Sequence, residues 1–352
     1  MTARIVVDAM GGDEAPAEQV AGALLAARKL KVDVTLVGDE PAIRAELVGK
    51  EGADLVRVVH AADVIGMDEH PTEAVRQKPE ASINVGLRLV KDGEADGFVT
   101  AGNTGAAMAA ALLRLGRIKG IGRPALGVVV PGMEDRRTLL LDVGANADSR
   151  AIHLVQWAHM GARFMAATYK LERPAVGLLS NGEEDTKGSE LVLEVNPRLR
   201  ASSSLNFHGN VEGRDVTAGV VDVVVTDGFT GNVVLKTGEG VGELIFAELR
   251  RAIGSKWWGK LAGLALLPDL RKARRRLDYS EYGGAQLLGV DGVTVIGHGR
   301  SNARAIANAV RAARDAVDNG VVEQIRDVGA EIPAKGRRDG GDAPGETDAD
   351  SD

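Results

Sequence analysis

One seven-residue pattern, V-T-x-G-x-T-G, occurs twice in the sequence, at 99–105 and again at 225–231. Each copy follows a short apolar run and precedes a stretch without helix breakers, as at a corner where a strand turns into a helix. The start of a helix presents unpaired backbone N–H groups and a partial positive charge, so it attracts anions. Glycine lets the backbone approach a ligand, and Thr104 and Thr230 are predicted to cap the two helices. The pattern predicts either two anion-binding corners or two ordinary strand–helix turns.

Polar residues beside glycines follow four further apolar runs. They are Asp8, Gly11 and Gly12 in "VDAMGGDEAP", Asp142 and Asn146 in "LLLDVGANAD", Glu183 and Lys187 in "LLSNGEEDTKGSE", and His298 in "VIGHGRSN". A single carboxylate after a strand is usually a turn or cap residue. Ligands of open α/β sheets, however, bind at the carboxyl ends of the strands. Together these loops therefore predict a polar cleft.

The elements that would carry these loops can be read from the apolar runs. Continuous Val, Ile and Leu runs predict strands that are buried on both faces, at 3–8, 32–38, 54–59, 96–102, 125–131, 137–144, 175–180, 220–228 and 292–297. Ala-rich helical stretches alternate with many of them, at 16–29, 104–115, 151–168 and 302–317. This alternation predicts a doubly wound, mostly parallel α/β fold.

The composition is that of an ordinary globular protein, and it excludes several kinds of chemistry. The 352 residues are 44% hydrophobic and 26% charged, and the formal net charge of −7 argues against a general nucleic-acid binder. The chain has no cysteine, which excludes disulfides, cysteine-ligated metals and a cysteine acyl-enzyme. Neither a signal peptide nor an apolar run of about 20 residues is visible. We therefore expect a cytoplasmic protein that at most binds a membrane surface.

Common cofactor and nucleophile motifs are missing or incomplete. The stretch "GSKWWGKL", at 254–261, ends in Leu where a P-loop needs Ser or Thr for magnesium. The first loop lacks G-x-G-x-x-G, and no G-x-S-x-G elbow occurs. The histidines lack the H-x-x-x-H spacing of a zinc helix. We therefore expect no cofactor and no metal.

Seven ordered motifs make the sequence resemble the bacterial phosphate acyltransferases of phospholipid synthesis (acyl-acyl-carrier-protein:phosphate acyltransferases). The motifs are "VDAMGGDEAP", "TAGNTGA", "LLDVGANAD", "NGEEDTKG", "GNVEGRD", "DGFTGNVVLK" and "YGGAQLLGV". The resemblance covers about residues 4 to 317. Small departures from the family pattern, which affect loop detail and any role for His298, lie at Ser180, Asn181, His208 and Arg300.

This resemblance implies a fold and an activity. The fold would be two-lobed and phosphotransacetylase-like, related to isocitrate and isopropylmalate dehydrogenases, with a catalytic domain at 1–334 and a helical arm at about 250–280. The tail, 335–352, lacks large apolar residues and is expected to be disordered. A homodimer would reversibly transfer a long acyl chain from acyl carrier protein to inorganic phosphate. A glycerol-3-phosphate acyltransferase would use the resulting acyl phosphate downstream.

The expected chemistry is direct attack of a phosphate oxygen on a thioester carbonyl, which depends on positioning and oxyanion donors more than on a strong base. Lys187 and Asn232 are predicted at the reacting centre, as phosphate ligand and as carbonyl or phosphate donor. Asn103 and Thr104 are predicted to cradle the anion together with the Gly11–Gly12 pair. The remaining predicted binding residues are Asp8, Asp142, Asn146, Glu183, Asp227, Thr230 and His298. They could orient the loops, line the substrate, or be ordinary turn residues.

A basic island interrupts the otherwise acidic chain. Residues 250–276 carry nine basic residues against one acid, a charge of +8, which leaves −7 − 8 = −15 for the rest. The island could bind an anionic membrane surface, dock the acidic acyl carrier protein, or pack on a dimer partner; the resemblance favours the membrane. The predicted contact residues are Arg250, Arg251, Lys256, Trp257, Trp258, Lys260, Leu264, Leu267, Arg271 and Lys272.

Three rival functions remain open at this point. A phosphotransacetylase that uses a short acyl-CoA would share the cleft and differ in its donor. A decarboxylating NAD-dependent dehydrogenase would need a tyrosine–lysine pair, but Tyr279 and Tyr282 lie beside no lysine. A scaffold that only binds acyl carrier protein at a membrane would leave the polar loops unexplained.

Overall fold

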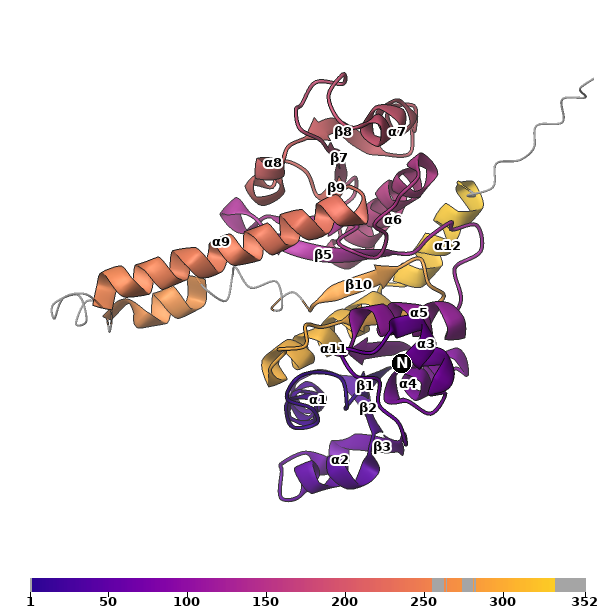
Figure 1. Ribbon diagram of the computed structural model, residues 1–352, viewed down its shortest axis with the longest axis vertical. Helices are drawn as coiled ribbons and strands as arrows, with labels where there is room; N and C mark the ends of the chain where they lie inside the picture. The colour runs from indigo at the N-terminus through magenta and orange to yellow at the C-terminus, as the bar shows by residue number, and fades with distance from the viewer. Residues whose placement is uncertain (1, 255–262, 264, 274–280, 282, 333–352) are drawn as a thin grey trace, which may run out of the picture.

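The computed structural model describes residues 2–254, 263, 265–273, 281 and 283–332. Eleven strands of this part form one sheet in the order β3-β2-β1-β4-β11-β10-β5-β6-β9-β7-β8 (Figure 1). The strands are β1 (Ala3–Asp8), β2 (Val32–Gly38), β3 (Val56–His60), β4 (Gly97–Thr100), β5 (Ala125–Pro131), β6 (Arg137–Leu141), β7 (Ala175–Leu179), β8 (Asn206–Val211), β9 (Val223–Val225), β10 (Ala285–Leu288) and β11 (Val293–Ile296). The predicted doubly wound, mostly parallel α/β class is confirmed.

The sheet consists of two parallel blocks that run in opposite directions. One block is β3-β2-β1-β4-β11 and the other is β6-β9-β7-β8. Between them, β10 is antiparallel to β11 and to β5, and β5 is antiparallel to β6. This odd number of reversals turns the second block around. The carboxyl ends of the strands in one block therefore lie at the opposite end of the sheet from those in the other block. We call each of these two ends, with the loops that follow the strands, the carboxyl edge of its block.

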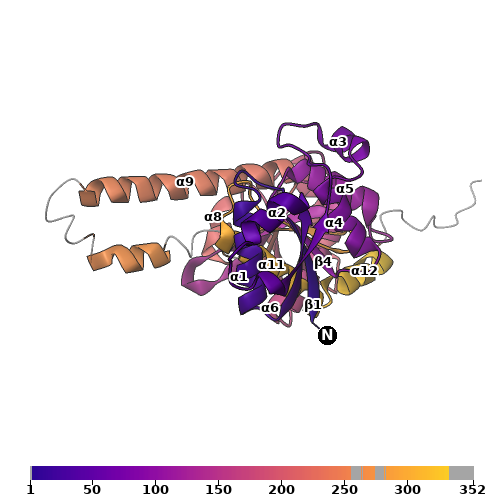
Figure 2. The ribbon, with the colours of Figure 1, turned by 90° about the horizontal axis from the view of Figure 1, so that it is seen from below.

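Helices cover both faces of the sheet, as the continuous apolar runs require. In β1, Ile5 and Val7 belong to the core cluster shared with α1, α6 and α11, whereas Val6 belongs to the cluster shared with α4 and α5. Figure 2 shows α3 and α5 on the face opposite to α1 and α6. The helices are α1 (Ala17–Lys29), α2 (Glu40–Leu47), α3 (Pro71–Gln77), α4 (Ser82–Lys91), α5 (Thr104–Arg114), α6 (Ala151–Tyr169), α7 (Glu190–Arg200), α8 (Gly213–Ala218), α9 (Gly228–Gly254), α11 (Ala303–Asp318) and α12 (Val321–Glu331).

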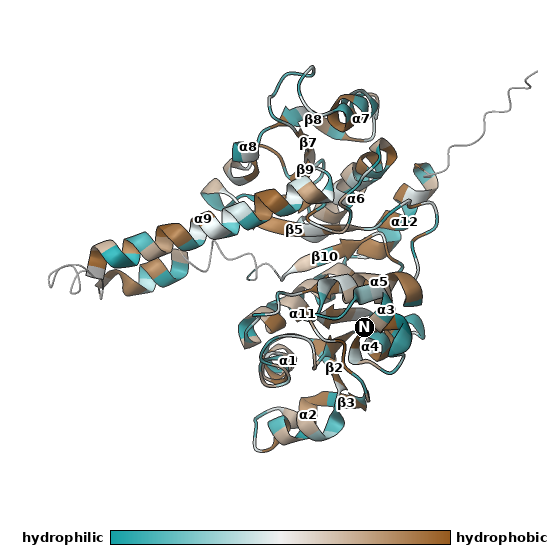
Figure 3. Cartoon of the chain, in the orientation of Figure 1, coloured by the Kyte–Doolittle hydropathy of each residue, from teal (hydrophilic) through white to brown (hydrophobic). Residues whose placement is uncertain are grey.

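The helical arm starts earlier in the chain than about 250, where the sequence placed it. Its first helix, α9, begins at Gly228 and projects away from the sheet, and the helical segment 265–273 returns alongside it (Figures 1 and 2). Large apolar side chains lie exposed along α9, among them Val241, Leu244 and Ile245, and Figure 3 shows apolar stretches along this helix. None of the described helices is both long enough and apolar enough to cross a bilayer.

Only part of the predicted contact set of the arm belongs to the described residues. Arg250, Arg251, Arg271 and Lys272 are exposed, and Leu267 is half-buried. The predictions for Lys256, Trp257, Trp258, Lys260 and Leu264, and for the tail at 335–352, lie outside the described residues.

Candidate active site

In the first block, the ends of β1 and β4 are joined through a buried carboxylate. Asp8 is 1% exposed and accepts hydrogen bonds from the Thr100 hydroxyl, at 2.7 Å, and from the Met10 N–H, at 3.0 Å. Gly11 lies against the same carboxylate, because a Cβ added there would be 2.6 Å from Asp8 Oδ2 and 2.7 Å from Gly102 N. Only glycine fits this approach between the two strand-end loops.

Asn103, and not the predicted Thr104, caps α5. The Asn103 side-chain oxygen accepts from the Ala106 N–H at 3.0 Å, and Thr104 is already the first helical residue, with an exposed side chain. Asn103 is the better cap because its carbonyl oxygen reaches the third N–H of the helix from the non-helical position. The cap prediction for Thr104 was therefore wrong by one residue.

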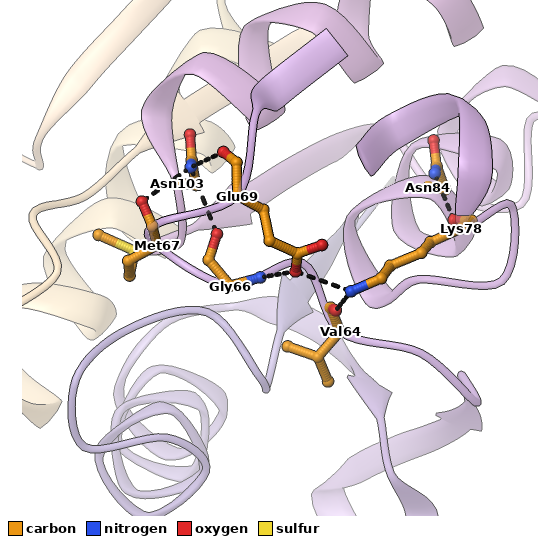
Figure 4. Close-up of polar contacts among 7 residues, drawn as sticks. All are labelled: Val64, Gly66, Met67, Glu69, Lys78, Asn84 and Asn103. Carbon is orange, nitrogen blue, oxygen red and sulfur yellow. Dashed lines mark hydrogen bonds and ion pairs between the residues drawn. The ribbon is translucent and has the colours of Figure 1, made fainter. Parts of the chain in front are cut away.

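The amide group of Asn103 holds a second loop, which sequence reasoning missed. Asn103 Nδ2 donates to the carbonyl oxygens of Gly66, Met67 and Glu69, at 3.3, 3.1 and 3.4 Å (Figure 4). The carboxylate of Glu69 accepts from the Gly66 N–H, at 2.6 Å, and from Lys78 Nζ, at 2.7 Å. We call residues 64–69 the strap. Since Asn103 Nδ2 is used in this way, the side chain of Asn103 fixes the strap beside the start of α5.

The loop after β11 completes this group. Gly12, at φ +125°, lies beside Gly299, and the Asp13 N–H donates to the Gly299 carbonyl at 2.8 Å. His298 is half-buried, and its Nδ1 accepts from the Arg300 N–H at 3.2 Å. The structure thus gathers Asp8, the Gly11–Gly12 pair, Asn103, Thr104 and His298 at the carboxyl edge of the first block.

In the second block, Asp142 follows β6 and organises the loop after it. Asp142 is fully buried, and its oxygens accept from the N–H groups of Leu126, Gly144, Ala145 and Asn146, at 2.8 to 3.2 Å. Asn146 Nδ2 adds a fifth hydrogen bond at 2.9 Å. Asn146 is itself 5% exposed and also donates to the Pro124 carbonyl at 2.8 Å. In this structure both side chains are therefore used to shape the loop.

Burial raises the pKa of both aspartates. Removal from water dominates for Asp8 and for Asp142, and the hydrogen bonds that each carboxylate accepts oppose it only in part. Neither aspartate forms an ion pair with a basic residue in the described chain. Both carboxylates consequently hold loops through N–H and O–H donors and do not pair with a cation.

The first turn of α9 packs directly on the Asp142 loop. The Gly228 N–H donates to the Asn146 carbonyl at 2.9 Å, and a Cβ added at Gly231 would be 1.9 Å from the Asp142 carbonyl oxygen. Asp227 accepts from the backbone N–H of Thr230, at 2.9 Å, and from its hydroxyl, at 2.7 Å. Thr230 is therefore inside the first turn, and the prediction that it caps α9 was wrong. Asp227 holds that position.

Asn232 and Lys187 are both exposed at this edge. Asn232, in α9, lies beside Gly144, whose added Cβ would be 3.7 Å from Asn232 Oδ1. Lys187 lies between β7 and α7, two residues before Ser189, the cap of α7. Its Nζ forms no hydrogen bond or ion pair with any described residue, whereas Glu183 in the same loop pairs with Arg214 at 3.1 Å. Lys187 is thus an uncompensated positive charge at the strand-end edge.

A buried amide fixes the Lys187 loop. Asn210, at the end of β8 and 3% exposed, donates from Nδ2 to the carbonyl oxygens of Glu184, at 2.8 Å, and Lys187, at 3.4 Å. Asn196 donates in turn to Asn210 Oδ1 at 2.9 Å. The sequence marks Asn210 only as part of the "GNVEGRD" motif. The backbone that carries Lys187 is therefore held in place, although its side chain is exposed.

Comparison with known proteins decides the family. A family model described as a fatty acid synthesis protein matches residues 3–324. The phosphate acyltransferase of Pelotomaculum thermopropionicum is 50% identical over 333 residues, which are 95% of this chain and 97% of that protein. The chain belongs to the phosphate acyltransferase family. The member from Thermosynechococcus vestitus is likewise 50% identical over 325 residues, which are 92% of this chain and 94% of the relative.

As a phosphate acyltransferase family member, the chain is an acyltransferase enzyme, as predicted. Its fold matches the EutD phosphotransacetylase from Staphylococcus aureus, with a TM-score of 0.58 and 14% identity, over 90% of this chain and 94% of the other. A branched-chain phosphotransacylase from Enterococcus faecalis V583 gives a TM-score of 0.58 at 16% identity, over 90% and 100%. The predicted phosphotransacetylase-like architecture is confirmed.

In this acyltransferase the predicted site residues form two groups, one at each block. The first holds Asp8, Gly11, Gly12, Asn103, Thr104 and His298, and the second holds Asp142, Asn146, Glu183, Lys187, Asp227, Thr230 and Asn232. No hydrogen bond or ion pair among the described residues joins one group to the other. A cavity of about 580 Å³ lies elsewhere, between α6, α11 and β10, and Lys272 is the single predicted residue that lines it.

Proposed function

We propose that the enzyme transfers a long acyl chain from acyl carrier protein to inorganic phosphate and so makes an acyl phosphate for phospholipid synthesis. Family membership supports the acyl transfer, and the printed names of the relatives support phosphate as the acceptor. The observation that carries the proposal is the position of Lys187 and Asn232. They follow β7 and β9, which are neighbouring parallel strands, so their loops share one edge of the sheet.

In the proposed reaction, Lys187 binds and orients the phosphate. Its ammonium group has no acidic partner among the described residues, so its charge is available to an anion. Phosphate is already anionic near neutral pH and requires positioning more than deprotonation. The start of α9 lies at the same edge, and the positive end of its helix dipole adds a favourable partial charge.

A phosphate oxygen then attacks the thioester carbonyl carbon. The new C–O bond forms as the carbonyl oxygen gains negative charge, and Asn232 donates a hydrogen bond to that oxygen or to the phosphate. The C–S bond breaks next, and the thiolate takes a proton from solvent or from the phosphate. A thiol of pKa about 8.5, by analogy with cysteine, leaves without a strong acid. The absence of cysteine from the sequence agrees with a single displacement.

The first group would complete the site from the other block. The backbone around the Gly11–Gly12 pair and the start of α5 would hold the thioester arm, while Asp8 and Asn103 hold those loops. In this proposal the substrates bridge the two groups.

We also propose a homodimer at the cytoplasmic face of an anionic membrane, with the arm as the contact. The exposed apolar residues of α9 and the exposed basic residues at 250, 251, 271 and 272 support a surface of this kind. Salt-sensitive retention on vesicles of anionic lipid would test the membrane part.

One experiment tests the proposed reaction. Long-chain acyl-[acyl carrier protein] is incubated with the enzyme, with and without phosphate, and acyl phosphate is trapped with hydroxylamine. We expect hydroxamate only when phosphate is present. Acyl-CoA of two to four carbons serves as the comparison donor, and faster turnover of that donor would contradict the assignment of the carrier protein. Loss of the thioester without hydroxamate would contradict acyl phosphate formation.

A further inference from the structure

Three arginines without acidic partners lie together at the start of α6. Arg150 directly precedes α6, and Arg117 and Arg123 lie in the loop between α5 and β5. All three are exposed, and none forms an ion pair with a described carboxylate. The exposed acid Asp148, in the same loop as Arg150, is not paired with any of them either. We call these three residues the arginine cluster.

Buried polar contacts hold the loop of Arg117 and Arg123 on α6. Trp157 Nε1 donates to the Arg123 carbonyl at 3.0 Å. Gln156 accepts from the Gly122 N–H and donates to the Gly120 carbonyl, each at 2.9 Å, and both α6 side chains are fully buried. Because the backbone is fixed at these points, the cluster is preorganised, and little conformational entropy is lost when a partner binds it.

A buried histidine, His153, lies between Arg150 and Trp157, and the Trp157 indole in turn holds the Arg123 carbonyl. His153 is 2% exposed, and Arg150 Nη2 lies 3.4 Å from its Nε2. Burial is the main cause that lowers the pKa of His153 to about 4, and the charges of Arg150, Arg123 and Arg117 contribute to this shift. The imidazole is therefore neutral at neutral pH and adds no charge to the cluster.

The cluster borders the second group of site residues. Asn146 is a member of the second group and also contacts the loop of the cluster. Its Nδ2 donates to the carbonyl of Pro124, the residue next to Arg123, and to Asp142. Its own carbonyl accepts from the Gly228 N–H at the start of α9. The basic arm lies elsewhere, since Figure 1 shows α9 leaving the sheet on the side away from α12, which packs on α6.

We infer that the arginine cluster is the docking surface for the acidic acyl carrier protein, an inference that rests on the proposed function. The chain carries a net charge of −7, so an acidic partner is repelled by most of its surface and attracted where positive charge is uncompensated. A carrier bound here would hold its thioester arm beside the corner formed by Asn146 and Gly228. The arm would then be free for the membrane.

The test uses the paired variant Arg123→Glu/Arg150→Glu, with Arg271→Glu/Lys272→Glu in the arm as a control of equal charge change. Binding of fluorescently labelled carrier protein is measured by anisotropy at low salt, and turnover is measured with acyl-carrier and with acyl-pantetheine. We expect the cluster variant to raise the Kd and the KM for the carrier at least tenfold and to leave turnover of acyl-pantetheine unchanged. The control pair should bind like the wild type.

Three outcomes would overturn the inference: unchanged carrier binding in the cluster variant, loss of binding in the arm control instead, or equal loss with both donors. Arg123→Gln/Arg150→Gln, with thermal unfolding as a check, separates loss of charge from loss of fold. Binding alone decides the docking surface. A wild-type enzyme that binds the carrier through the cluster but forms no acyl phosphate would therefore overturn the proposed reaction and leave the docking surface standing.

Discussion

The two copies of V-T-x-G-x-T-G occupy matching corners of the two strand blocks. β4 pairs in parallel with β1, which ends at Asp8, and β9 pairs in parallel with β6, which is followed by Asp142. Both aspartates are buried, and burial raises the pKa of both. The helices, however, begin at different positions of the pattern: α5 begins at its sixth residue and α9 at its fourth. One pattern thus encodes the same strand pair with two different helix starts.

This shift changes what each corner presents. At the fifth position the first copy has Asn103, which is 8% exposed and holds the strap, and the second has Phe229, which is 67% exposed. The side chain after the second copy, Asn232, is also exposed. The first corner is therefore anchored, and the second presents an exposed amide with no hydrogen bond to another described residue. This difference favours the second corner as the reacting one.

The last glycine of each copy should show the largest contrast. An added Cβ at Gly231 would be 1.9 Å from the Asp142 carbonyl, whereas at Gly105 it would be 2.7 Å from Pro71 Cγ, a side-chain atom. Gly231→Ala should lower the free energy of unfolding by about 3 kcal/mol or more, and Gly105→Ala by about 1 kcal/mol. Urea denaturation measures both, and equal losses would mean that the two corners pack alike.

Neutralising the aspartates should separate the corners next. Both oxygens of Asp142 accept N–H donors, so an amide NH₂ there would face another donor. At Asp8 the Thr100 hydroxyl can reverse its direction and accept. We expect Asp142→Asn to cost about 2–4 kcal/mol and Asp8→Asn about 1 kcal/mol. Thermal unfolding of the two variants is the measurement, and a larger loss for Asp8→Asn would reverse the assignment.

The caps should differ in what else they hold. Asn103→Ala and Asp227→Ala each remove a helix cap, at a cost of about 1 kcal/mol. Only Asn103→Ala should also release the strap, because Asn103 Nδ2 contacts three of its carbonyl groups. Hydrogen exchange at residues 64–69 should therefore quicken in Asn103→Ala and stay unchanged in Asp227→Ala. Unchanged exchange in both variants would show that Glu69 and Lys78 hold the strap without Asn103.

The last contrast is a pH dependence of the helix behind the second corner. Burial lowers the pKa of His159, in α6, from 6.5 to about 4. Between these values the unfolded chain binds more protons than the folded one, so stability falls as pH drops from about 6.5 to about 4. His159→Gln, which can keep the hydrogen bond to Ser202, should flatten this fall when melting temperatures at pH 7 and 4.5 are compared. A parallel fall in the variant would assign the effect to other groups.

Local patterns predicted much of this molecule. Apolar runs located nine of the strands in the described chain, because strands buried on both faces have no polar alternation to obscure them. They missed β8, an edge strand that reads N-F-H-G-N-V, and β10, whose apolar run A-Q-L-L is interrupted by Gln286. Turn residues marked both buried aspartates. Which of several Asn, Asp and Thr residues caps a helix, however, depends on the residue at which the helix starts.

Contacts between distant segments could not be predicted in this way. The strap joins Asn103 to residues 34 to 37 positions away, and the arginine cluster combines two loops separated by two strands. No local spacing signals either arrangement. The uncompensated state of Lys187 also became visible only when the partners of the surrounding charges were known.

The rate of acyl phosphate formation by Lys187→Ala, compared with Lys236→Ala, tests the proposed site most directly. Lys236 is an exposed lysine of α9 that pairs with Glu239 at 2.8 Å, and its removal should leave the rate within about twofold, as for an ordinary surface pair. Lys187→Ala should keep the fold and lose about 10²-fold or more, as for removal of one charge-stabilising group at a reacting centre. If Lys187→Ala turns over like Lys236→Ala, the phosphate is held elsewhere, and the second corner is not the reacting one.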